Sequence, residues 1–103
     1  MTDPAPEGAA DATIGALRRT LPIANKRGLH ARAAAKFVRS AGQFDAAVRV
    51  SFKGQDVSGL SIMGLMMLAA GIGSSIELSC SGRQAAEAMA ALSALVESKF
   101  GED

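Results

Sequence analysis

The residues best suited to chemistry lie in one short segment, Gly28-Leu29-His30-Ala31-Arg32, which holds the only histidine of the 103-residue chain. A neutral imidazole is a nucleophile near pH 7. An arginine two residues later supplies a permanently charged guanidinium, which can donate two hydrogen bonds to phosphate oxygens. If a helix begins at His30, its free backbone N–H groups bind an anion at the same place. Gly28 allows the backbone a close approach without a Cβ. The segment therefore suits a nitrogen nucleophile that takes up a phosphoryl group and passes it on.

Residue types alone also fit a simpler interpretation, in which His30 is a polar helix start and Arg32 a solvated first-turn residue. Other chemistries have less support. One histidine, one cysteine and no clustered carboxylates give no metal-ligand set. No nucleophile elbow of the GxSxG type occurs. We expect neither a metal nor a cofactor.

A second polar candidate is Ser61, which precedes the apolar segment Ile62-Met63-Gly64-Leu65-Met66-Met67-Leu68. As a helix N-cap it would contribute about 1 kcal/mol and need no regulation. As a phosphorylation site it would place new charge beside an interaction surface, and a helix N-terminus tolerates a phosphate. Both interpretations can hold together. We expect Leu65 and Leu68 in the core, while the other apolar side chains form an adaptable exposed patch.

Composition limits the function further. The formal charge of +1 and the aromatic content of 4% argue against a nucleic-acid-binding surface. Cys80 is the only cysteine, so no intramolecular disulfide can form, and we expect it as a small core residue in a cytoplasmic protein. The N-terminus does not resemble a secretory signal, and the longest apolar run, around residues 62–72, is too short and too interrupted by glycine to span a bilayer.

The elements that must position these residues follow from periodicity. Residues 1–15 are expected to be a flexible tail and residues 16–103 a single domain. Alternation and helical spacing predict strands at 17–24, 46–52, 55–59 and 75–80, and helices at 30–41, 61–68 and 83–100. Pro22 cannot donate to a sheet, which makes the first strand an edge strand, and Gly42 is expected to end the first helix. The order βαββαβα predicts an α+β fold with a four-stranded antiparallel sheet and three helices on one face.

Residues 28–38 and the Ser61 segment together resemble the histidine-containing phosphocarrier family, HPr, of the bacterial phosphoenolpyruvate-dependent phosphotransferase system. Residues 71–82 fit the loop, strand and turn before that family's last helix, and the resemblance covers about residues 17–100. It implies an open-faced β-sandwich with strand order 1-4-2-3. One position departs from the family pattern His-x-Arg-Pro, because Ala33 stands where proline is usual. Alanine is an excellent helix former, so we expect the helix to survive.

The resemblance also implies roles. His30 would accept a phosphoryl group on Nδ1 from an enzyme I-type phosphotransferase, Arg32 would steady it, and a IIA-type domain would receive it. Ser61 would match the site used by HPr kinase/phosphorylase. The docking surface near His30 would include Leu29, Ile62, Met63 and Met66. Such a protein is a monomeric phosphocarrier rather than an enzyme.

Two other classes of function remain as alternatives. One is a non-phosphorylated regulatory interaction module, which would not need the pair of His30 and Arg32. The other is a small nucleic-acid-binding domain, which the charge and the lack of surface aromatics disfavour.

Overall fold

The computed structural model describes residues 16–102, so the predicted tail lies outside the described residues. The element order matches the predicted βαββαβα arrangement, with one short 3-10 helix added at the end. The strands are β1 (Leu17–Pro22), β2 (Ala47–Phe52), β3 (Gln55–Ser58) and β4 (Ser75–Ser81). The helices are α2 (Ala31–Ala41), α3 (Ile62–Met67), α4 (Ala85–Glu97) and the 3-10 helix η1 (Lys99–Gly101).

The four strands form one antiparallel sheet in the order β1-β4-β2-β3, which confirms the predicted order and the edge position of β1. The pairing of β1 with β4 ends at Pro22, opposite Ser75, two residues before the predicted end of the strand. Pro22 itself has no N–H to donate to this ladder. Ile23 still bonds to the chain that precedes β4, through its N–H to Ser74 and its carbonyl to Gly73.

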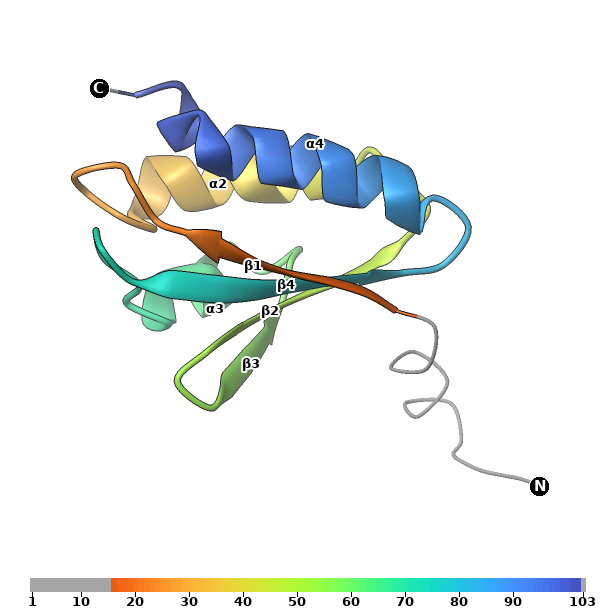
Figure 1. The fold of residues 1–103 in the computed structure, drawn as a ribbon, viewed down its shortest axis with the longest axis horizontal. Helices are drawn as coiled ribbons and strands as arrows, with labels where there is room; N and C mark the ends of the chain where they lie inside the picture. The colour runs from red at the N-terminus through yellow and green to blue at the C-terminus, as the bar shows by residue number, and fades with distance from the viewer. Residues whose placement is uncertain (1–15, 103) are drawn as a thin grey trace.

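The helices cover one face of the sheet, as predicted. Figure 1 shows α2 and α4 side by side on that face, and α3 packs against α2 and β3. Between the layers lies one hydrophobic core. Its largest fully buried side chains include Phe37, Phe100, Leu65, Leu78 and Leu92. Cys80 is buried in the same core, as expected, and burial raises the pKa of its thiol.

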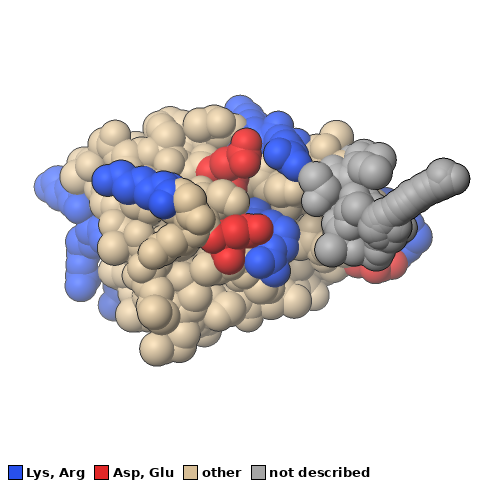
Figure 2. All heavy atoms as spheres, turned by 90° about the horizontal axis from the view of Figure 1, so that it is seen from below, with Lys and Arg blue, Asp and Glu red and all other residues tan. Residues whose placement is uncertain are grey.

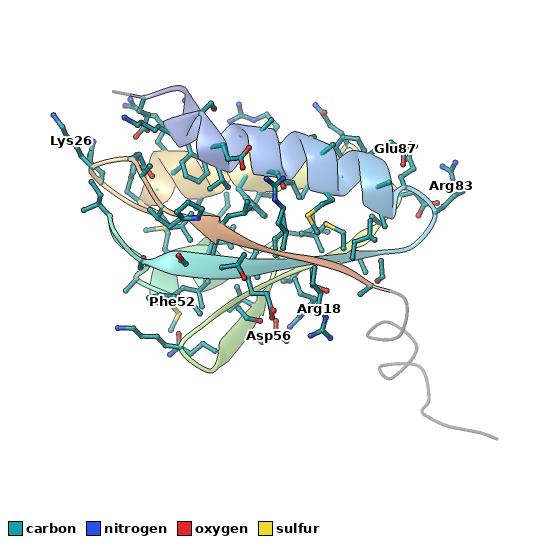
Figure 3. All side chains as sticks on the ribbon, viewed as in Figure 1. Arg18, Lys26, Phe52, Asp56, Arg83 and Glu87 are labelled. Atoms are coloured by element: carbon teal, nitrogen blue, oxygen red, sulfur yellow. The ribbon has the colours of Figure 1, made fainter. Side chains whose placement is uncertain are left out.

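The other face of the sheet is open and carries charges of both signs. Arg49 in β2 pairs with Asp56 in β3 at 3.3 Å, and Figure 3 shows Arg18 and Asp56 pointing away from the helices. On the face drawn in Figure 2, acidic side chains lie beside basic ones and do not form a separate acidic patch. Within residues 16–102, no helix has the length and apolar character needed to cross a membrane.

The end of the last helix differs from the sequence prediction. The last helix was expected to reach Phe100, but α4 ends at Glu97, and Lys99 and Phe100 adopt left-handed φ angles of 61° and 57°. Phe100 extends the apolar pattern of the helix because its side chain is fully buried. In the structure, however, the chain reverses after α4, and this reversal rather than a longer helix brings Phe100 into the core. Gly42 ends α2 as its C-cap, as predicted, with a right-handed φ of −68°.

Candidate functional site

His30 stands at the N-terminus of α2, as the sequence predicted. It is the N-cap residue, with extended backbone angles (φ −75°, ψ 178°), and its carbonyl accepts the first helical bond from the Ala34 N–H at 2.9 Å. Its side chain makes no capping bond to the helix. The backbone therefore begins the helix while the imidazole stays available for other contacts.

A tight loop holds His30 in place. The buried Asn25 donates from Nδ2 to the Gly28 carbonyl at 2.8 Å, and the Leu29 N–H donates to the Ala70 carbonyl at 3.0 Å. Gly28 has a left-handed φ of 62°, and a Cβ built there would lie 2.4 Å from the Ala70 oxygen. The close approach predicted for Gly28 therefore exists, and its partner is the backbone of residues 70–71 that lies against the loop.

A carboxylate contacts the imidazole from the far end of the chain. Both side-chain oxygens of Glu102 lie 2.9 Å from His30 Nε2, and the two side chains keep only 14% and 16% of their area exposed. This hydrogen bond, more than any other effect, holds the pKa of Glu102 below its ordinary value, and Lys36 adds a smaller attraction. Glu102 was not predicted from the sequence, because its contact with His30 depends on the reversal of the chain after α4.

Lys36 is a second missed residue, and it fixes the same segment. Its Nζ donates to the Phe100 carbonyl at 2.6 Å, which ties the end of the chain to α2. The loop after β1 and the segment after α4 lie at the same end of the molecule, and Figure 3 shows Lys26 pointing outward from the tip of that loop. The site is therefore assembled from parts that lie far apart in the sequence.

Arg32 is exposed in the first turn of α2. Within residues 16–102, its guanidinium has no hydrogen bond and no ion pair, so it can take an added anionic ligand.

Ala33 follows Arg32, fully buried, and α2 is intact around it, which confirms the expectation that the helix survives without proline. In the same described range, no three histidine, cysteine or carboxylate side chains are placed to hold a metal ion.

Leu29 was expected to help form the docking surface, and the structure corrects this. Only 4% of the residue is exposed, because it packs into the hydrophobic core directly beneath His30. A partner protein could not reach it without opening that core. Its place in the sequence, next to the histidine, suggested exposure, but the loop turns its side chain inward.

Ser61 caps α3, as predicted. Its Oγ accepts the Gly64 N–H at 2.9 Å, and the side chain is partly exposed. Leu65 and Leu68 are buried, as expected, while the other apolar side chains of the helix face solvent. We call these the α3 patch: Ile62, Met63, Met66 and Met67, exposed to 40%, 67%, 38% and 71%. Because α3 packs on α2, the patch and His30 belong to neighbouring elements.

Comparisons with known proteins agree with this architecture. The family model described as "PTS HPr component phosphorylation site" matches residues 17–98. The chain is 52% identical to the phosphocarrier protein HPr of Cupriavidus necator over 86 residues, which cover 84% of this chain and 97% of that protein. It is 43% identical to the phosphocarrier protein NPr of Shewanella violacea, covering 84% and 94% of the two chains.

Solved structures give the same result. The crystal structure of HPr-C-His from Thermoanaerobacter tengcongensis superposes with a TM-score of 0.81 at 44% identity, covering 84% of this chain and 98% of that one. The agreement extends over nearly all of the described residues and includes both the fold and the segment around His30. The chain therefore belongs to the HPr family of phosphocarrier proteins of the phosphotransferase system.

Proposed function

We propose that His30 carries the phosphoryl group, on Nδ1, and that the group arrives from an enzyme I-type phosphotransferase and leaves to a IIA-type domain. The observation that carries this proposal is the way His30 is held. Nε2 is engaged by Glu102, and the described residues place no hydrogen bond on Nδ1. The ring nitrogen left for chemistry is therefore the one that the family resemblance implies.

The surroundings of His30 favour a bound phosphoryl group. The first N–H groups of α2 have no intrahelical acceptor, and the helix dipole adds partial positive charge there. The exposed Arg32 supplies a bidentate donor to the same end of the helix. Together these groups would hold the phosphate oxygens without a metal ion and without covalent help from other side chains.

Phosphorylation can be tested without ambiguity of position, because the chain has a single histidine. The protein is incubated with phosphoenolpyruvate and enzyme I, and the adduct is assayed for acid lability and base stability. We expect one phosphoryl group per wild-type chain and none in His30→Ala. An Arg32→Ala variant should be modified more slowly. Absence of the adduct in wild type would leave the non-phosphorylated interaction module as the better description.

The α3 patch is the surface that we propose for partner docking. Exposed methionines adapt their shape to different partners, as a carrier serving both a donor and several acceptors requires. Met63→Asp should weaken binding to enzyme I at least tenfold in a titration followed by NMR, because it places a charge in an apolar contact. Lys53→Asp, on the turn between β2 and β3, is the matched control and should bind as wild type does.

Ser61 is proposed as a site for regulatory phosphorylation by an HPr kinase/phosphorylase. Its hydroxyl is partly exposed, and the Gly64 N–H that it now accepts could equally bind a phosphate oxygen. The test is acid-stable phosphate added by the kinase with nucleotide. We expect wild type and the control Ser58→Ala to be modified and Ser61→Ala to remain unmodified. If the kinase modifies no variant, Ser61 serves only as a helix cap.

A further inference from the structure

We propose that Glu102 is a positioning residue that keeps a proton on Nε2 of His30 through the whole transfer cycle. This inference rests on the proposed phosphorylation of His30 at Nδ1. It assigns to the C-terminal segment a part in the chemistry that neither the sequence pattern around His30 nor the helix N-terminus supplies.

The contact between the two side chains defines the tautomer of the ring. An ionised carboxylate can only accept hydrogen bonds, and both of its oxygens lie 2.9 Å from Nε2. Nε2 must therefore carry the hydrogen. In the neutral imidazole the lone pair then lies on Nδ1, which is the nitrogen required for attack on phosphorus.

The segment that carries Glu102 is fixed on both sides of the turn. Phe100 is fully buried with a left-handed φ of 57°, and Gly101 continues the turn with φ of 73°. The Phe100 carbonyl is held by Lys36 from α2, the helix that His30 starts. A carboxylate carried on such an anchored turn is preorganised against the imidazole.

The proton on Nε2 has a clear consequence for each step. On loading, the Nδ1 lone pair forms a bond to phosphorus while the donor's N–P bond breaks and its electron pair returns to the donor ring. The product ring carries phosphoryl on Nδ1 and hydrogen on Nε2, so it is cationic. On unloading, a nucleophile of the acceptor domain forms a bond to phosphorus while the Nδ1–P bond breaks. The electron pair of that bond returns to the His30 ring, which is left as neutral imidazole with its hydrogen on Nε2. No proton has to move, whereas a ring without the Nε2 hydrogen would have to leave as imidazolate.

Few charges face this pair within the described residues. His30 itself and Lys36 act on Glu102 from α2, and Asn25 adds a neutral amide from the loop before it. The hydrogen bond from His30 and the charge of Lys36 both favour the ionised carboxylate, so Glu102 stays an acceptor at neutral pH. The pH dependence of the phosphorylated ring should therefore report the charge of Glu102 directly.

The experiment compares wild type with Glu102→Gln, which keeps a similar shape but removes the charge. Both proteins are phosphorylated with enzyme I, and hydrolysis of the phosphohistidine is followed from pH 5 to pH 10. We expect the pH at which hydrolysis slows to move down by about one unit in the variant. At pH values above both midpoints, that shift corresponds to hydrolysis about tenfold slower.

A second readout does not depend on phosphorylation. The 15N shifts of the single imidazole report its tautomer, and we expect wild type to be mainly Nε2–H and Glu102→Ala to contain more Nδ1–H. Glu97→Gln is the control, because it removes the same charge from a carboxylate that pairs with Arg19 instead, and it should match wild type. An unchanged tautomer and pH profile in both Glu102 variants would overturn the proposal, as would equal shifts in Glu97→Gln. Failure of wild type to be phosphorylated would instead contradict the proposed function.

Discussion

Gly28 lets the loop before His30 pack closely against the backbone of residues 70–71. Its left-handed φ and the 2.4 Å approach that a Cβ would make to the Ala70 oxygen leave no room for a side chain. We predict that Gly28→Ala lowers the free energy of unfolding by about 2–4 kcal/mol, because strain in φ adds to a backbone clash. Urea unfolding followed by circular dichroism measures the loss.

A matched control separates the two causes. Gly54, in the turn between β2 and β3, also has a left-handed φ of 81°, but nothing lies within 4 Å of a Cβ there. Gly54→Ala should therefore cost about 1 kcal/mol, the contribution of φ alone. Equal losses in the two variants would mean that the contact with Ala70 contributes nothing.

Glu102 should give the protein a characteristic acid sensitivity. Its pKa is lower in the folded protein than its ordinary value, mainly because of the hydrogen bond to His30. The stability that it contributes is thus fully present above its ordinary pKa of about 4.3 and is lost as the pH falls through the folded value. The melting temperature of wild type should exceed that of Glu102→Gln from pH 7 down to pH 5, and the difference should shrink below pH 4. A difference that stays constant to pH 3 would contradict this.

The sequence predicted some of the site residues and not others, for a physical reason. His30, Arg32 and Ser61 could be predicted because the roles proposed for them depend on neighbours within a few positions, where residue type and helix start can be recognised. Glu102 lies 72 residues from His30, and its approach depends on left-handed angles at Lys99 and Phe100. Neither residue type favours those angles, so no local pattern signals the turn.

At the scale of elements, the start of α2 supports the imidazole whatever residue stands at position 33. Ala33 occupies the third position of the helix, where an N–H has no intrahelical acceptor, so proline costs no helical bond there. We predict that Ala33→Pro changes the free energy of unfolding by less than about 1 kcal/mol. Ala34→Pro is the control. It removes the bond from the Ala34 N–H to the His30 carbonyl and should cost about 3 kcal/mol, measured by urea unfolding.

The start of α3 depends on a side chain instead. Because the Ser61 Oγ accepts the Gly64 N–H, Ser61→Ala should lose about 1 kcal/mol of stability, while Ser61→Asp should retain it by supplying another cap. Thermal unfolding of the three proteins tests this. A Ser61→Asp variant as unstable as Ser61→Ala would show that the added charge is not tolerated at this helix end.

Element type could be predicted throughout because burial imposes period 2 on the strands and period 3.6 on the helices. Element ends were less certain. β1 stops at Pro22 and α4 at Glu97, although apolar side chains continue to Ile23 and Phe100. An apolar residue in the sequence indicates a side chain that must point into the core. A loop or a chain reversal can place it there as well as a helix or strand can, so the apolar pattern does not fix where an element ends.

At the scale of the whole molecule, both edges of the sheet are poorly suited to pairing with another chain. β3 has only four residues, and β1 carries Arg18, Arg19 and a terminal Pro22. Short, charged and proline-containing edges oppose strand addition. We predict a monomer by sedimentation equilibrium, with an apparent mass independent of protein concentration. A mass that rises towards twice the chain mass on concentration would contradict this.

The pairing of β1 has a consequence for how the protein is made. β1 is hydrogen-bonded in the sheet to β4 alone, and β4 begins only at Ser75. During synthesis on a ribosome, β1 therefore has no native strand partner until residues 75–81 have also emerged. The charged residues and the proline of β1 then act as gatekeepers for the nascent chain, because they hinder non-native strand pairing during that interval.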